Sequence, residues 1–493
     1  MMKQSRRDFI KNAGCGLTMA AMAAQAEHFG LLNTLAQKTS VKGGLGGTPS
    51  DYRALVCIYF GGGNDGNNMV IPNHSDANVS GYPAYSAARA PQGLALAQNT
   101  LLPVSVPRIG GLSYGLHPSF GTITGGINPG LHPLWDQGKL AMVTNIGTLV
   151  RPITRIEYQT DPSSRPRNLF SHSDQTNQHQ TARADMVVLS GWGGRISDRM
   201  TFSSNPTGLI PTISSISGPR LFTVGDSTQP LSLGPAPTPL SSILALTGYT
   251  GTPIANARLT ALEAQLDIEQ TQDIVRASNE IHREAIRISR SLNDGAEVTV
   301  VFPNTDIGNQ LKQVARLIKA RSALHVTRQI FMVTLDGFDT HTAQLTGQGT
   351  LLGRFSQAAR AFYDEMVAQG ISDKVTQFTM TDFNRTFNPG GAGTNVGSDH
   401  AWANHQFVIG GGVMGGNFYG NNTSNGTPFP TLVNNGPDDS DSSNARGRWI
   451  PTTSVEQYAG TLASWFGLPS ADVPFVFPNM ANFPVTNLGF MTS

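Results

Sequence analysis

The sequence predicts an α/β fold in which a mostly parallel sheet is flanked by helices and interrupted by loop-rich insertions. Short, continuously apolar runs, each stopped by a polar or glycine-rich cluster, are typical of strands buried on both faces of such a sheet. Segments with helical spacing of apolar residues alternate with these runs, which is the pattern of α/β domains. The 54 glycines and 30 prolines among 493 residues indicate a globular chain with many loops.

The candidate strands and helices can be placed by residue number. Buried strands are expected at residues 54–60, 140–145, 329–335, 375–380 and 406–409. Helices are expected at 255–292, 309–323 and 351–368, where apolar residues recur at helical spacing. A segment rich in Pro, Gly and Ser, around 201–252, predicts an insertion of loops and short strands. Because ligands of α/β folds gather beyond the carboxyl ends of strands, the polar clusters that follow the strands are the candidate site.

The first 26 residues have the features of an export signal. Arg6 and Arg7 precede Phe9 and Lys11, a short apolar run follows, and a small residue lies on each side of Gln25. This pattern is typical of a twin-arginine signal peptide. The sequence therefore predicts export by the twin-arginine translocation machinery to the periplasm or outside the cell. We expect a signal at 1–26, a linker at 27–53, and one large domain at 54–493 with the insertion around 201–252.

The sequence argues against a membrane span and against nucleic-acid binding. No stretch reaches 18 consecutive apolar residues, so no stable membrane span is expected. The formal net charge is +1, without a long Lys/Arg run beyond the first eleven residues, which argues against nucleic-acid binding.

Carboxylates and imidazoles collect behind the predicted strands. Asp339 and His341 follow the strand at 329–335, whereas Asp399, His400 and His405 follow the strand at 375–380. Oxygen and imidazole nitrogen ligands together suit zinc, manganese or a similar divalent ion. Two such ions about 3.5–4 Å apart can stabilise both the attacking and the leaving oxygen of a displacement. The sequence thus predicts one or two divalent ions.

Motifs spread over nearly the whole predicted domain resemble the exported bacterial family called domain of unknown function 1501, which is grouped with the alkaline-phosphatase-like superfamily. They are Phe60–Asn68, Ser190–Arg195, Gly337–His341, Asp399-His400, Gly410–Val413 and Pro451–Tyr458. The resemblance implies an alkaline-phosphatase-like fold, a metal-binding Asp65 at the end of the first strand, and metal ligands at Asp399, His400 and His405. The superfamily's other ligand pair is normally Asp-x-x-x-His, whereas one residue separates Asp339 from His341 here.

The resemblance also implies a nucleophile, since this superfamily attacks with a Ser, Thr or modified Cys activated by the metal. Ser171, followed by His172, is the candidate, and the alternative is that it caps the helix that follows. Arg385 is a candidate clamp for a substrate oxyanion, with Asn67 as a second donor. The alternative for Arg385 is an ion pair with Asp382 or another carboxylate. Asp438–Asp441 could bind calcium or form a solvated turn.

Two functions remain open from the sequence. The first is an exported metal-dependent hydrolase of small-molecule phosphate or sulfate esters. The second is a non-catalytic, metal-stabilised binding or assembly protein of the periplasm or cell surface on the same scaffold. The density of ligand-type residues favours the hydrolase, while the altered Asp-x-His spacing and the uncertain nucleophile favour the binding protein.

Overall fold

A computed structural model describes residues 51–240, 251–268 and 297–492, with Tyr249 and a few positions between 275 and 289. The signal expected at 1–26 and nearly all of the linker at 27–53 lie outside the described residues. The same holds for the end of the segment around 201–252 and for most of the expected helix at 255–292. The first part of that helix is observed as α9 (Pro253–Leu266).

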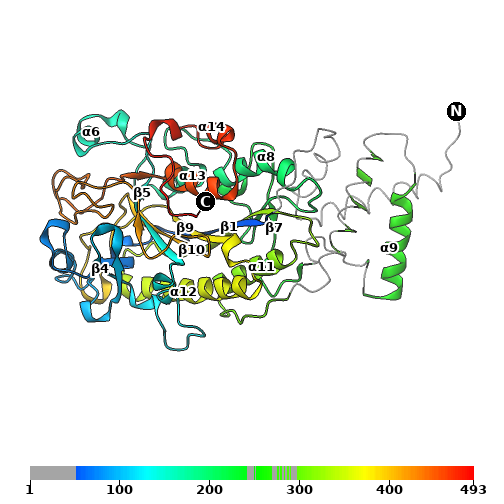
Figure 1. The fold of residues 1–493 in the computed structure, drawn as a ribbon, viewed down its shortest axis with the longest axis horizontal. Helices are drawn as coiled ribbons and strands as arrows, with labels where there is room; N and C mark the ends of the chain where they lie inside the picture. The colour runs from blue at the N-terminus through cyan, green and yellow to red at the C-terminus, as the bar shows by residue number, and fades with distance from the viewer. Residues whose placement is uncertain are drawn as a thin grey trace.

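A nine-stranded sheet forms the centre of the molecule (Figure 1). Its middle strand, β1 (Arg53–Gly61), pairs in parallel with β8 (Arg328–Asp336) on one side and with β9 (Val375–Thr381) on the other. Every residue of β1 except its two end residues is buried, as its unbroken apolar run predicts. The strand order is β11-β5-β10-β9-β1-β8-β6-β7, and β12 pairs with β5.

The sheet is mixed: its pairings through β1 and β6 are parallel, and those of one strand, β10, are antiparallel. β10 (Asn404–Gly410) runs antiparallel to both of its neighbours, β9 and β5 (Leu140–Gly147). The segment between β9 and β10 contains a single 3-10 turn and no crossover helix, and parallel neighbours require a crossover that is usually helical. The start of β10 therefore lies beside the carboxyl end of β9, so the residues just before β10 reach the same sheet edge as those that follow β8 and β9.

Helices cover both faces of this sheet, and Figure 1 shows α11 (Asp306–Lys319) and α12 (Gln344–Ala368) below it, with α8 (Trp192–Ser204) and α13 (Val455–Phe466) above. Alternate residues of β1 belong to two different hydrophobic clusters: Val56 and Ile58 pack with the residues of α11 and α12, whereas Cys57 and Tyr59 pack with those of α8 and α13. The alternation is the consequence of the two-residue period of a strand. The fold is thus α/β with helices on both faces.

Shorter elements complete the structure. A separate three-stranded antiparallel sheet consists of β2 (Val70–Pro72), β3 (Leu102–Val106) and β4 (Leu112–Leu116). The short strands of the main sheet are β6 (Ile213–Ser215), β7 (Leu231–Ser232), β11 (Phe418–Tyr419) and β12 (Thr453–Ser454). The helices are α3 (Gly66–Met69), α4 (Tyr82–Arg89), α5 (Pro133–Asp136), α6 (Arg155–Thr160), α7 (His172–Thr181) and α14 (Val473–Val476). In the described part of the segment around 201–252, β6 and β7 extend the main sheet beyond β8.

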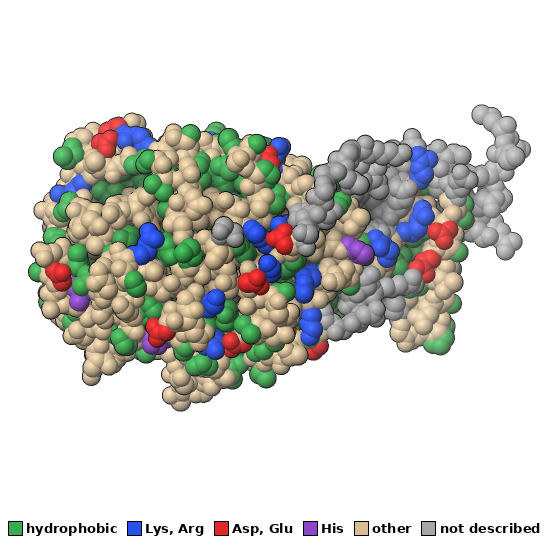
Figure 2. Space-filling view, in the orientation of Figure 1, with side chains coloured by type: hydrophobic (Ala, Val, Ile, Leu, Met, Phe, Trp, Pro, Cys, Tyr) green, Lys and Arg blue, Asp and Glu red, His purple; other side chains and the backbone are tan. Residues whose placement is uncertain are grey.

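The described surface carries charges of both signs. In the space-filling view of Figure 2, basic and acidic side chains lie among hydrophobic and uncharged ones, in keeping with the formal net charge of +1. No helix among the described residues has both the length and the apolar character needed to cross a membrane.

Glu456, in the first turn of α13, is a buried carboxyl group. Its side chain is 1% exposed, and its Oε1 atom has no hydrogen-bond partner among the described residues. Burial raises the pKa of Glu456 to about 8, because an apolar surrounding disfavours the charged form. The folded protein therefore holds a proton at Glu456 under conditions in which the unfolded chain has released it.

We predict that Glu456→Gln makes the free energy of unfolding less dependent on pH. The unfolded carboxyl titrates near 4.5 and the folded one near 8, so the wild-type protein loses stability as pH rises through this window, on the order of 1 kcal/mol per pH unit. Denaturant unfolding at pH 5 and pH 8.5 measures the effect. Equal pH dependence in the variant and the wild-type protein would contradict the assignment.

Candidate metal centre

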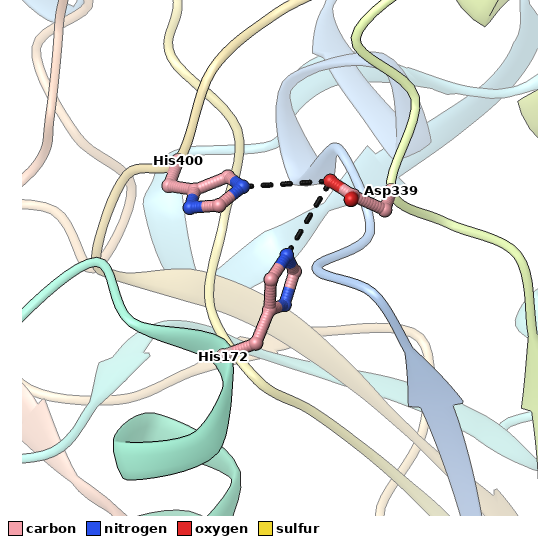
Figure 3. Close-up of side chains that lie close together, drawn as sticks. All are labelled: His172, Asp339 and His400. Carbon is pink, nitrogen blue, oxygen red and sulfur yellow. Dashed lines mark ion pairs between the residues drawn. The ribbon is translucent and has the colours of Figure 1, made fainter.

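Three side chains from distant parts of the sequence converge at one edge of the sheet (Figure 3). One ligand-type atom each of His172, Asp339 and His400 lies within 4.8 Å of the others. His172 is the first residue of α7, Asp339 lies in the loop after β8, and His400 lies just before β10. The Nε2 atoms of His172 and His400 are each 3.4 Å from Oδ1 of Asp339.

A third histidine borders this group. Nε2 of His341 is 3.1 Å from Oδ1 of Asp339 and 3.1 Å from Nε2 of His400. The side chains of Asp339 and His341 are 48% and 45% exposed, and those of His172 and His400 are 34% and 24% exposed. The cluster is therefore open to solvent, and a ligand can reach it.

The Nδ1 atom of each of the three histidines lies within hydrogen-bond distance of an oxygen acceptor. Nδ1 of His172 lies 2.7 Å from Oδ2 of Asp382, and Nδ1 of His400 lies 2.7 Å from the carbonyl oxygen of Phe170. Nδ1 of His341 lies 3.3 Å from Oδ1 of Asp399. Carbonyl and carboxylate oxygens only accept hydrogen bonds, so each Nδ1 donates. A neutral imidazole then has its lone pair on Nε2, the usual arrangement of metal-binding histidines.

This arrangement fits a divalent cation. The Nε2 atoms of His341 and His400 are 3.1 Å apart, and two lone pairs at that distance repel each other unless a proton or a cation lies between them. Nε2 of His172 is buried and has no hydrogen-bond partner among the described residues. Two ligands about 2.0–2.1 Å from a tetrahedral zinc lie roughly 3.3–3.4 Å apart, which matches the Nε2–Oδ1 distances. The donor set suits zinc or manganese.

Arg385 holds Asp339 in place. Its Nη2 donates to Asp339 and to the carbonyl of Gly62, its Nε donates to Gly63, and its Nη1 donates to Ser398. Although burial raises the pKa of Asp339, the hydrogen bond and charge of Arg385 outweigh that effect and bring this pKa to about 2. Arg385 is itself fully buried. The structure thus shows the ion-pair alternative for Arg385, with Asp339 rather than Asp382 as the partner.

Asp399 supports the cluster from behind. Its Oδ2 accepts a hydrogen bond of 2.7 Å from Arg446, while its Oδ1 faces Nδ1 of His341. Burial raises the pKa of Asp399, but the charge of Arg446 outweighs it and lowers the pKa below its usual value. The structure therefore places Asp399 behind His341, not among the atoms that converge.

The Asp438–Asp441 segment anchors the loop that carries Arg446, so it is not a solvated turn. Asp439 is fully buried, and its carboxylate accepts hydrogen bonds from the backbone N–H groups of Asn435, Asp441 and Arg448. Arg448 in turn donates to the carbonyl of His400 over 2.8 Å. The oxygens that calcium would need at Asp439 are occupied by backbone donors.

Asp65 lies apart from the cluster, contrary to the role implied by the resemblance. It is buried, forms an ion pair with Arg89, and accepts hydrogen bonds from Gln344 and from the backbone and side-chain nitrogens of Asn67. Asn67 is likewise buried between Asp65, the Arg385 carbonyl and Trp449. The carboxylate of Asp65 is therefore used to cap α3, and Asn67 has no free donor for a substrate.

His405 is also separate from the cluster. The register between β10 and β5 shifts between Asn404 and Gln406, so His405 occupies an irregular position of the strand. Its Nδ1 accepts a 3.2 Å hydrogen bond from the backbone of Asn145, its ring stacks on Phe429, and its side chain is buried. Burial lowers the pKa of His405 to about 3. This histidine is a neutral core residue.

Ser171 occupies the N-cap position of α7, directly before His172. Its Oγ makes no capping hydrogen bond to the helix backbone and instead donates to Oδ2 of Asp174 over 2.7 Å. The structure thus confirms the position expected from the capping alternative but not its hydrogen bond.

The place of His172 in the cluster, and that of the groups behind it, was not expected from the sequence. Asp382 joins His172 to Tyr59, whose hydroxyl donates to Oδ1 of Asp382 over 2.7 Å. The hydrogen bond to Asp382 raises the pKa of His172. His172 begins a helix instead of following a strand, so a search at strand ends passed over it. The signal available was its place directly after Ser171.

We predict that His172→Asn and His400→Asn lose zinc and manganese affinity. Removing a ligand should weaken binding by more than the roughly 10–100-fold that loss of a supporting partner costs. His325→Asn is the matched control, because His325 is exposed on a turn with a positive φ that asparagine tolerates. Metal content after dialysis and competition with a chelator measures affinity. Unchanged affinity in either cluster variant would contradict the site.

We predict that Asp382→Asn weakens metal binding by about 10–100-fold without unfolding the protein. The asparagine keeps the shape but removes the charge that orients His172. The control is Asp373→Asn, since Asp373 is exposed and its carboxylate forms an ion pair with Lys374, away from the cluster. The same chelator competition, with a thermal melt to verify folding, provides the measurement. Equal affinities in the two variants would show that Asp382 does not support the site.

Comparison with known proteins bears on the family of this chain. A search of curated proteins finds no match. The model of a family described as "Protein of unknown function (DUF1501)" matches residues 52–429, which is more than half of the chain. That range contains every residue of the cluster, and the chain belongs to this DUF1501 family.

Proposed function

We propose that the chain is an exported metal-dependent hydrolase of phosphate or sulfate esters, with one divalent ion held by His172, Asp339 and His400. The observation that carries this proposal is the convergence of two imidazole nitrogens and a carboxylate oxygen at a solvent-open edge of the sheet. Sites with three protein ligands are typical of catalytic zinc, whereas structural zinc usually has four. Export rests on the twin-arginine motif at residues 1–26.

The residues around the cluster supply proton transfer. A bound divalent ion polarises an ester oxygen and makes water a nucleophile at neutral pH. His341 is half exposed, and its Nε2 lone pair faces Asp339, so it can take a proton from the attacking group and return it to the leaving group. Asp399 behind it stabilises the imidazolium form, and Arg446 keeps Asp399 ionised.

The resemblance offers Ser171 as the nucleophile in place of water. Its position next to His172 favours this role, whereas its hydrogen bond to Asp174 uses the hydroxyl proton. Attack by Ser171 would require that hydroxyl to turn away from Asp174.

One observation favours the second function, a non-catalytic binding or assembly protein. Nε2 of His341 is closer to Oδ1 of Asp339, at 3.1 Å, than are the nitrogens of His172 and His400, at 3.4 Å. With His341 as a fourth ligand, the donor set would be closed, as in structural zinc sites. The role of His341 therefore separates the two functions.

We predict that His341→Gln keeps its metal and loses roughly 10²–10⁴-fold in kcat/KM, the usual contribution of a general acid–base group. Aryl phosphate and aryl sulfate esters are assayed with the zinc-loaded and manganese-loaded protein, and metal content is measured in parallel. Full activity in the variant would remove His341 from the mechanism.

Two further results decide between the functions. Loss of metal from His341→Gln, together with no turnover of any ester by the wild-type protein, would establish the non-catalytic alternative. In an active protein, Ser171→Ala with unchanged turnover would assign the attack to water, whereas loss of turnover with metal retained would assign it to Ser171.

A further inference from the structure

A cavity of about 630 Å³ lies beside the first half of α12, which forms one of its walls. The apolar side chains of Leu96, Ile123, Ile127 and Leu345 contribute to its lining, and Ile127 is 49% exposed. None of the residues of the metal cluster lines this cavity. It is therefore a separate place on the molecule, and its walls can take an apolar ligand.

One buried polar side chain in the lining, that of His117, has an unused hydrogen-bond donor. His117 is 5% exposed, and its Nδ1 accepts a 3.0 Å hydrogen bond from the backbone N–H of Ser119. A neutral imidazole that accepts at Nδ1 has its proton on Nε2, and burial keeps the ring neutral by lowering the pKa of His117 to about 4. Nε2 has no hydrogen-bond partner in the part of the chain that the structure describes. Its N–H group is thus available to an acceptor in the cavity.

Two glycines of α12 leave the space beside His117 open. Gly349 and Gly353 lie one turn apart and both line the cavity. Glycine in a helix interior is less stable than alanine, yet close packing does not require it here. A methyl group on Gly349 would lie 3.4 Å from Cε1 and 3.8 Å from Nε2 of His117, and one on Gly353 would lie 3.4 Å from Ile123, which are ordinary contacts. The two glycines therefore keep room in front of His117 at a cost to helix stability.

The cavity has a positive side chain and no acidic one. Arg354 is the single Lys, Arg, Asp or Glu residue of the lining. It is exposed, and no hydrogen bond or ion pair engages it within the described ranges. A carboxylate suits both polar groups, because it is an anion that Arg354 attracts and an acceptor for the Nε2–H group of His117.

We propose that this cavity binds a small amphipathic carboxylate, a hydrocarbon chain that ends in one carboxyl group. The chain packs against Leu96, Ile123 and Leu345, and the carboxylate accepts a hydrogen bond from Nε2 of His117 and pairs with Arg354. Cavities of this size, with apolar walls and a few placed polar groups, are typical of small-molecule sites. The site lies outside the metal cluster, so the proposal goes beyond the hydrolase function and does not rest on it.

Calorimetric titration with octanoate and with octanamide tests the proposal. Octanamide has the same chain and a carbonyl acceptor but no charge, so we expect the wild-type protein to bind octanoate more tightly. Arg354→Gln should weaken octanoate binding about tenfold and leave octanamide binding unchanged. Arg258→Gln is the matched control, because Arg258 is exposed on α9 outside the cavity lining, and it should change neither affinity.

Two further variants test the interior of the cavity. His117→Asn keeps an acceptor for the N–H group of Ser119, since asparagine is a favoured N-cap residue, but it lacks the Nε2 donor. We expect it to weaken the binding of both compounds about tenfold. Gly349→Leu places a side chain in front of His117 and should abolish the binding of both. Gly349→Ala, measured by thermal melt, should raise the midpoint of unfolding, which shows that glycine is not needed there for folding.

The outcomes decide the proposal independently of any ester hydrolysis. Absence of octanoate binding to the wild-type protein overturns it, and so does binding that Arg354→Gln and His117→Asn leave unchanged. Equal affinities of the wild-type protein for octanoate and octanamide overturn the assignment of a carboxylate ligand. If Gly349→Leu does not fold, the Arg354 and His117 variants still decide, because each removes one named contact.

Discussion

The crowding of lone-pair atoms around Oδ1 of Asp339 is the constraint on which the site depends. Three imidazoles have their Nδ1 atoms paired with acceptors, so in the neutral rings each Nε2 atom carries a lone pair. Arg385 relieves the carboxylate but reaches the nitrogen of His341 only at 3.5 Å. Buried charges around the cluster and the left-handed backbone of Phe170 cost folding free energy. A bound cation would offset that cost.

The direction of one strand makes this convergence possible. Asp339 and Asp382 follow β8 and β9, as expected for an α/β sheet. His400 reaches them because β10 runs against its neighbours, which places the start of β10 at the carboxyl edge. In a fully parallel sheet the residues before β10 would lie at the opposite edge, more than the length of a strand away. The antiparallel direction of β10 and the convergence of the His172, Asp339 and His400 side chains are therefore linked.

The strands, and through them Asp339, His341 and His400, could be located from the sequence. Buried strands appear there as apolar runs, and the ends of these strands define one edge of the sheet. Asp65, Asp399 and His405 were also expected among the ligands, and they lie outside the group of atoms that converges. Proximity of Asp65 to a strand end could not reveal its partner Arg89 on α4, and His405 lies at a register shift that no local pattern predicts. His172 was missed since its position depends on how α7 packs against β9, a tertiary contact without a sequence period.

Charge balance around the cluster favours a single divalent ion. Asp339, Asp382 and Asp399 contribute three negative charges, and Arg385 and Arg446 contribute two positive ones. With neutral histidines the group has a net charge of −1, which one divalent ion converts to +1. A second ion would raise the charge to +3 and would need ligands beyond the one cluster that the described residues assemble. A centre with a net charge of +1 would attract an anionic ligand.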